Sequence, residues 1–179
     1  PISAPGAVDR VTAMPATPDD LFRKLDALGL PHATVEHPPL KTVEESRALR
    51  GALPGGHAKN LFLKNKKGWL YLLVAEEDAK VEIKAFAKAI GAGNLSFGNP
   101  DLLMATLGVV PGAVTPFALI NAPPGGIAVY LDQALLAHDP LNFHPLDNRM
   151  TTTVRRDDLL AFVDALGHTF EVIDLTSLG

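Results

Sequence analysis

The segment GGHAKNLFLKNKKGWLYLLV, residues 55–74, constrains the fold of this chain more than any other. Two apolar runs flank a cationic tip at Lys64, Lys66 and Lys67, and this pattern predicts two paired strands joined by a solvated turn. Lys59 does not belong to the tip, because it lies at the start of the first apolar run, between a Gly-Gly break and Asn60. A chain with such a hairpin builds a sheet, and its other segments must cover that sheet.

Helical and strand-like patterns alternate irregularly around the hairpin. A capping residue followed by proline opens predicted helices at 17–28 and 99–108, which Gly29 and Gly108 end. Three further helices are predicted at 42–53 (capped by Thr42), 80–91 and 155–167. Strands are predicted at 32–37, 115–121, 127–135, 148–154 and 169–175. Because no regular βαβ repeat is present, the predicted fold class is α+β: a single-domain mixed, curved β-sheet flanked by helices.

Composition limits the possible classes of protein. The 179 residues are 47% hydrophobic and 20% charged, as in a soluble globular domain. The apolar runs are far shorter than the ~20 residues of a membrane span. Residues 1–13 lack periodicity and are predicted to be a disordered leader or an expression remnant, with the domain at 14–179. No signal-peptide pattern is present, so a cytoplasmic location is expected.

The sequence lacks the common catalytic and metal-binding motifs. It contains no GxxxxGK[ST], GxGxxG, HExxH or GxSxG. With no cysteine, disulfides, thiolate metal sites and a cysteine nucleophile are excluded. His138 and His144, with Asp139 or Asp147, fit no familiar metal site, so no metal or other cofactor is expected. The remaining histidines, at 32, 37, 57 and 168, are interpreted as solvated or loop residues.

Two loops have unusual chemistry. TLGVVPGAVTPFAL, residues 106–119, is apolar and punctuated by Gly108, Pro111 and Gly112, so its backbone could approach a small ligand closely. The alternative is an ordinary helix-to-strand connection. NFHPLDNRMTTTV, residues 142–154, gathers polar side chains just before a Thr-rich strand, although a plain polar loop would look the same.

Three segments together are more specific than any one of them. AKNLFLKNKKGWLYLLV, LSFGNPDLLMATLGVVPGAVTPFAL and TTTVRRDDLLAFVDALGH, in this order, resemble the YbaK/prolyl-tRNA editing family. The Lys59-Asn60 pair and the Gly-Val-x-Pro-Gly-x-Val-x-Pro-Phe loop are the most specific marks. The resemblance runs from about Thr17 to the C-terminus, and it is strongest to the free-standing enzymes that deacylate Ala-tRNA(Pro).

The resemblance implies a hydrolase that acts in trans on mischarged Ala-tRNA(Pro) and spares Pro-tRNA(Pro) by size exclusion. Such editing is needed because a proline site loses only ~1–3 kcal/mol of contact when the smaller alanine binds. An aminoacyl ester is already activated, so positioned water and oxyanion stabilisation can suffice without a metal. The implied partners are the acceptor end of tRNA(Pro) and either prolyl-tRNA synthetase or an elongation factor. The alternatives are the same chemistry on Cys- or Ser/Thr-tRNA, or a non-catalytic aminoacyl-tRNA-binding module.

The resemblance also assigns residues. Lys59 and His144 are the implied catalytic residues, and Asn60 is implied to bind substrate, although a regular strand would turn it to the face opposite Lys59. The implied amino-acid pocket consists of Gly108, Val109, Val110, Pro111 and Gly112. The overall charge of −4 does not indicate a general nucleic-acid binder, so tRNA would need a local basic patch. The lysines predicted to form it are Lys64, Lys66, Lys67, Lys80, Lys84 and Lys88.

Overall fold

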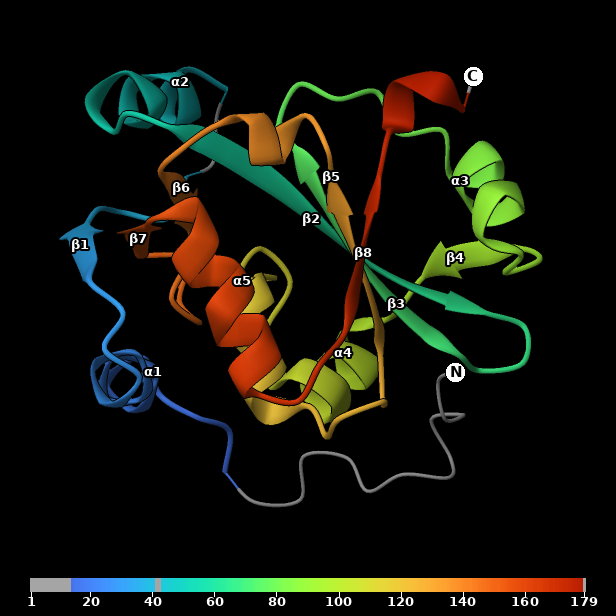
Figure 1. Cartoon of the computed structure of the whole chain (residues 1–179), viewed down its shortest axis with the longest axis horizontal. Helices are drawn as coiled ribbons and strands as arrows, with labels where there is room; N and C mark the ends of the chain where they lie inside the picture. Colours follow the sequence, from blue (N-terminus) through green and yellow to red (C-terminus); the bar gives the residue numbers. More distant parts are fainter. Residues whose placement is uncertain (1–13, 41–42, 179) are drawn as a thin grey trace.

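A computed structural model describes residues 14–40 and 43–178 (Figure 1). The predictions for residues 1–13 and for a helix cap at Thr42 lie outside these residues. The helices are α1 (Pro18–Ala27), α2 (Val43–Ala52), α3 (Ile83–Ile90), α4 (Pro100–Leu107) and α5 (Arg156–Ala165). The strands are β1 (His32–Glu36), β2 (Gly56–Asn65), β3 (Leu70–Glu76), β4 (Leu95–Phe97), β5 (Ala128–Asp132), β6 (Leu141–Phe143), β7 (Met150–Val154) and β8 (Phe170–Ile173).

The strands form one mixed sheet. Their order is β1-β7-β6-β2-β3-β5-β8, and β4 pairs with β2 beside this path. The predicted hairpin is confirmed, because β2 and β3 pair antiparallel from Ala58 opposite Glu76 to Lys64 opposite Leu70. Parallel pairs join β2 to β6, β3 to β5 and β5 to β8. The predicted α+β class, a mixed sheet flanked by helices, is confirmed.

Both faces of the central strands are covered. On β3, Leu72 and Val74 pack into a core with α1, α4 and α5, whereas Leu73 packs on the other face with Phe86 of α3. Successive side chains of a strand point to opposite faces, so a strand buried on both sides is apolar throughout. Six of the seven β3 residues are buried. Figure 1 shows α5 and α3 well apart, on different sides of the central strands.

Two sequence predictions are corrected by the structure. Residues 115–121, predicted as a strand, form the 3₁₀ helix η2 (Pro116–Asn121). The Thr115 hydroxyl accepts a hydrogen bond from the Phe117 amide and caps this turn, and proline at the first position favours helical backbone. Of the histidines interpreted as solvated or loop residues, His57 instead lies half-buried within β2. His168 does lie in the loop between α5 and β8, but it is 3% exposed rather than solvated, and its Nε2 lies 3.0 Å from the Ala122 carbonyl. Strands β4 and β6, three residues each, were not predicted.

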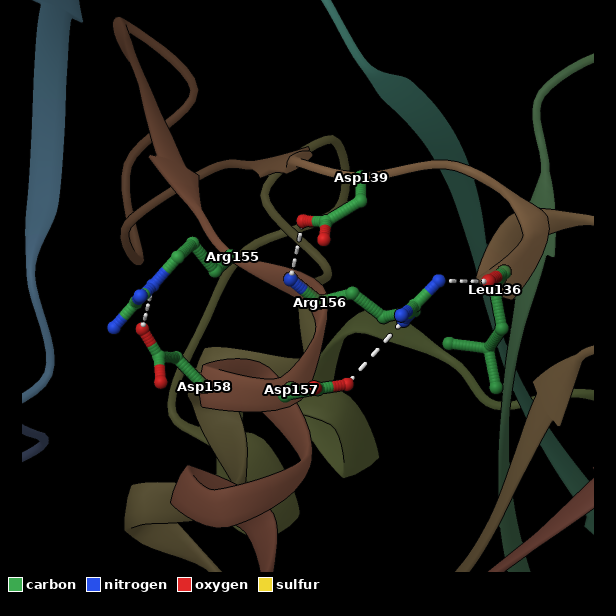
Figure 2. Close-up of polar contacts among 6 residues, drawn as sticks. All are labelled: Leu136, Asp139, Arg155, Arg156, Asp157 and Asp158. Atoms are coloured by element: carbon green, nitrogen blue, oxygen red, sulfur yellow. Dashed lines mark hydrogen bonds and ion pairs between the residues drawn. The ribbon is translucent and has the colours of Figure 1, made fainter.

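The start of α5 is fixed to the segment before β6 (Figure 2). The Arg156 amide donates to Oδ1 of Asp139 at 3.0 Å, and its guanidinium donates to the Leu136 carbonyl at 3.2 Å. Arg155 pairs with Asp158 within the first turn at 2.9 Å. The Asp139 carboxylate thereby pairs one of the amides that a helix N-terminus leaves free, and the two contacts of Arg156 tie the start of α5 to residues 136–139. In residues 14–40 and 43–178, no helix has the length and apolar character needed to cross a membrane.

Candidate active site

A cavity of about 220 Å³ lies where β2, β6, β7 and α2 meet. We call it the Asn60–His144 cavity. Its walls are Leu40, Leu49, His57, Ala58, Asn60, Glu77, Asn142, Phe143, His144 and Thr151. In Figure 1 it belongs to the region where α2, the start of β2 and strands β6 and β7 come together. Of the residues predicted to form the site, the cavity brings together Asn60 and His144.

Asn60 has a polar atom that the protein leaves unpaired. The Asn60 side chain lies on the same face of β2 as Ala58 and Phe62, which pack on the core with α4 and α5. Among the described residues, two buried side-chain nitrogen or oxygen atoms lack a hydrogen-bond partner, Oδ1 of Asn60 and Nδ1 of His168. Buried polar atoms are nearly always paired, so this oxygen, which solvent does not reach, is a costly exception in a residue that lines the cavity.

His144 is held in a defined tautomer. Its Nδ1 lies 2.8 Å from the Met150 carbonyl, and a carbonyl can only accept, so Nδ1 carries the hydrogen. Burial lowers the pKa of His144, while the hydrogen bond to Met150 opposes the shift. The ring is therefore neutral near pH 7, and its Nε2 lone pair can accept a hydrogen bond or a proton.

The loop between His144 and Met150 is constrained. Leu146 has φ 69°, a left-handed conformation that is strained for a branched residue and is often found at functional sites. Arg149 donates to both carboxylate oxygens of Asp147, from Nε at 3.0 Å and from Nη2 at 2.6 Å. These hydrogen bonds hold the pKa of Asp147 at about 2. The pairing fixes the turn that carries the carbonyl partner of His144.

Sequence reasoning did not single out Thr151 or His37 as site residues. Nε2 of His37 lies 2.8 Å from Oγ1 of Thr151, and its Nδ1 lies 2.8 Å from the Pro38 carbonyl. The His37 and His144 rings are 6.1 Å apart between centroids. His37 and Thr151 are 114 residues apart, so no local spacing could have indicated this contact.

Asn142 and His57 support the cavity. Asn142 is 3% exposed and donates to the Pro54 and Gly56 carbonyls, both at 3.1 Å. Its oxygen accepts from the Thr153 hydroxyl at 2.6 Å, so the amide is fully engaged. Nε2 of His57 lies 2.9 Å from the carbonyl of Leu53, which follows α2. These bonds fix the start of β2 relative to α2 and β6.

Lys59 points away from the Asn60–His144 cavity. Because β2 is regular here, Lys59 shares the α3 side of the sheet with Leu61 and Leu63, as its alternation with Asn60 predicted. Its Nζ donates to the carbonyl of Ala79, which follows β3. The structure therefore does not bring Lys59 together with Asn60 and His144. It does connect Lys59 to the segment that begins with Glu77, a residue of the cavity wall.

The loop at 108–112, predicted to form the amino-acid pocket, does not line the cavity, since none of its residues is among the wall residues. Gly108 ends α4 with φ 67°, Val109 is buried, and Val110 is 52% exposed. Pro111 leads into Gly112, which has φ 91°. A Cβ at Gly112 would lie 3.4 Å from Nδ2 of Asn148, so this loop lies beside the loop that carries His144.

The six predicted tRNA-binding lysines lie away from the cavity. Lys66 and Lys67 are exposed at the hairpin turn, and Lys84 and Lys88 are exposed on α3. Figure 1 shows the hairpin turn and α3 at the end of the molecule opposite α2, β6 and β7. Lys80 is exposed before α3, and Lys64 is half-buried within β2.

One acidic group could hold a cation. Glu76, Glu77 and Asp78 are, in the described residues, the only His, Cys, Asp or Glu side chains that lie close enough together to share a metal ion. They follow one another at the end of β3, where consecutive exposed acids are common without any ion. His138 and His144 do not form such a group within the described chain.

Comparison with known proteins identifies the family. Residues 37–162 match the model of the aminoacyl-tRNA editing domain. The chain belongs to the aminoacyl-tRNA editing domain family. It is 36% identical over 156 residues to the Prolyl-tRNA editing protein ProX of Acetoanaerobium sticklandii, across 87% of this chain and 95% of that protein. The resemblance inferred from the sequence is confirmed.

Two further comparisons agree. The chain is 38% identical over 153 residues to the Prolyl-tRNA synthetase associated domain-containing protein 1 of Bos taurus, across 83% of this chain and 89% of that protein. A crystal structure described as a proposed trans-editing enzyme for prolyl-tRNA synthetase superposes with a TM-score of 0.66 at 23% identity. It covers 89% of this chain and 97% of the other, and it supports the fold alone.

Proposed function

We propose that this protein is a trans-editing deacylase that hydrolyses Ala-tRNA(Pro) to alanine and free tRNA(Pro) and spares Pro-tRNA(Pro). Family membership and the name of the ProX relative support prolyl-tRNA editing. The observation that carries the proposal is the Asn60–His144 cavity, where the Asn60 amide and the neutral imidazole of His144 line one small space.

The reaction requires a positioned water and a proton acceptor. Nε2 of His144 takes a proton from water as the water oxygen bonds to the ester carbon. The bond from that carbon to the ribose oxygen then breaks, and the proton passes to the leaving oxygen. Asn60 lines the same cavity and is proposed to hold the bound acyl group through its side-chain amide. An aminoacyl ester is activated enough for this chemistry without a covalent nucleophile, and the proposed mechanism is independent of metal.

The size of the cavity supports a small acyl group. Its 220 Å³ is below the ~300–1,000 Å³ of sites for drug-sized ligands. In the proposal, the 108–112 loop limits this space indirectly, because Gly112 lies beside Asn148 in the loop that carries His144. The proline ring then meets the wall where the alanine methyl group does not.

Lys59 enters the proposal through its contact with the Ala79 carbonyl. By holding the segment after β3, it positions Glu77 in the cavity wall. In the proposal, Lys59 therefore acts as a positioning residue rather than in the catalytic role that the sequence resemblance implied. The acceptor stem of tRNA(Pro) is proposed to bind the exposed lysines of the hairpin turn and α3, and prolyl-tRNA synthetase or an elongation factor is the proposed protein partner.

The test is a panel of tRNAs charged with Ala, Pro, Cys, Ser or Thr, with release of the amino acid followed over time. Rapid release of alanine from tRNA(Pro), with Pro-tRNA(Pro) intact, is expected. Rapid release of proline would contradict size exclusion, and faster release of Cys, Ser or Thr would reassign the substrate. Binding without any release would establish a non-catalytic module. Activity should survive EDTA on a short acceptor-stem substrate, which does not need magnesium to fold.

A further inference from the structure

The Thr151 hydroxyl is oriented by a second residue. Thr151 lies on β7, is 4% exposed and lines the Asn60–His144 cavity. Its Oγ1 is 2.8 Å from Nε2 of His37. The other ring nitrogen of His37 lies 2.8 Å from the Pro38 carbonyl, which can only accept, so Nδ1 carries the hydrogen. In the neutral ring Nε2 is therefore an acceptor, and the Thr151 hydroxyl donates to it.

The backbone holds His37 in this place. Its amide donates to the Arg149 carbonyl at 2.9 Å and extends the β1–β7 ladder by one step. In that ladder Val35 stands opposite Thr151 and Glu36 opposite Met150. The hydroxyl hydrogen is therefore directed to His37, which leaves lone pairs of Thr151 Oγ1 for a group in the cavity.

Two polar atoms of the cavity wall consequently share one character. Oγ1 of Thr151 and Nε2 of His144 are both acceptors, and both residues line the cavity. A group bound between them must donate hydrogen bonds. A water molecule donates two hydrogen bonds. When both go to fixed acceptors, a lone pair of the water oxygen points away from these acceptors and is available to attack an ester carbon.

We propose that His37 and Thr151 form a positioning pair that orients the hydrolytic water against His144. His37 holds the Thr151 hydroxyl, Thr151 accepts one hydrogen of the water, and Nε2 of His144 accepts the other and takes that proton. The water oxygen bonds to the ester carbon, the bond from that carbon to the ribose oxygen then breaks, and His144 passes the proton to that oxygen. This inference rests on the proposed function.

The test uses Thr151→Val, which removes the hydroxyl and keeps the shape, on an Ala-charged acceptor stem of tRNA(Pro). Loss of one orienting hydrogen bond should lower kcat by about 10-fold or more. The Kd of a stem carrying alanine through a non-hydrolysable amide should stay within about 2-fold of the wild type. Thr151→Ser should restore most of kcat because it restores the hydroxyl.

His37→Phe should lower kcat similarly in the wild-type background and have little further effect in Thr151→Val, because residues that act through one group are non-additive. His37→Gln, which retains an acceptor, should recover part of the rate. Thr152→Val is the matched control. Its hydroxyl is equally buried on β7 but pairs with Thr34 at 2.7 Å outside the cavity wall, so its loss should leave kcat unchanged.

Three results would overturn the positioning pair. They are an unchanged kcat in Thr151→Val, additive losses in the double variant, or a weakened Kd with kcat preserved, which would mean that Thr151 contacts the substrate itself. Each requires a wild-type enzyme that hydrolyses the alanyl stem. A wild type without that activity contradicts the proposed function instead, so the two failures are distinguishable.

Discussion

Asn60→Leu is expected to make the protein more stable and nearly inactive. The Asn60 amide oxygen is buried in the cavity wall with no partner in the protein. A buried polar atom without a hydrogen bond costs about 1–3 kcal/mol, and an apolar side chain of similar size removes that cost. For a chain of this length, such a gain raises Tm by about 2–12 °C.

The assay pairs urea unfolding with alanyl-stem deacylation on the same preparations. Asn142→Leu is the matched control, since Asn142 also borders the cavity but has every polar atom of its amide engaged. Its replacement leaves two carbonyls and the Thr153 hydroxyl without their partner, and should lower the free energy of unfolding by about 2–4 kcal/mol. A less stable Asn60→Leu variant, or one that retains wild-type kcat, would refute the assignment of Asn60 as a ligand-binding group.

Three further predictions concern other parts of the chain. Burial lowers the pKa of His168 below 6.5, so its contribution to stability is complete above pH 6.5 and is lost as pH falls through the lowered value. The free energy of unfolding in urea, measured between pH 5 and 7, should therefore depend less on pH in His168→Gln than in the wild type. An equal pH dependence in the two proteins would contradict this assignment. Lys59→Ala should release the segment at Ala79 and lower kcat/KM by about 10²-fold, with little loss of secondary structure by circular dichroism. Wild-type turnover in this variant would show that Lys59 has no part in positioning the site. Replacing Lys84 and Lys88 with Gln should raise KM and lower the slope of log Kd against log salt by about two, while unchanged values would show that α3 does not contact tRNA.

Local sequence signals predicted the elements that local interactions determine. Thr17 caps α1 through the Asp20 amide, and Asn99 caps α4 through the Leu102 amide, as their positions before proline indicated. Alternation along β2 likewise predicted that Lys59 and Asn60 face opposite sides of the sheet. Each of these features depends on residues a few positions apart.

The remainder depends on packing between distant segments. The 3₁₀ turn at 116–121 is an exception, because its signal was local: Thr115 before Pro116 repeats the cap-then-proline pattern of α1 and α4, but the apolar run was interpreted as a strand. His37 meets Thr151 only because β1 pairs with β7. The unpaired oxygen of Asn60 could not be predicted from the sequence either, because it depends on the absence of a neighbouring donor in the folded protein.

The most direct test of the proposed site is a structure of the protein bound to a tRNA(Pro) acceptor stem that carries alanine through a non-hydrolysable amide. The alanyl group should occupy the Asn60–His144 cavity, with its carbonyl carbon within reach of a water bound to Nε2 of His144. An alanyl group bound on the opposite face of β2, beside Lys59 and the Ala79 carbonyl, would contradict the proposed site and return the catalytic role to Lys59.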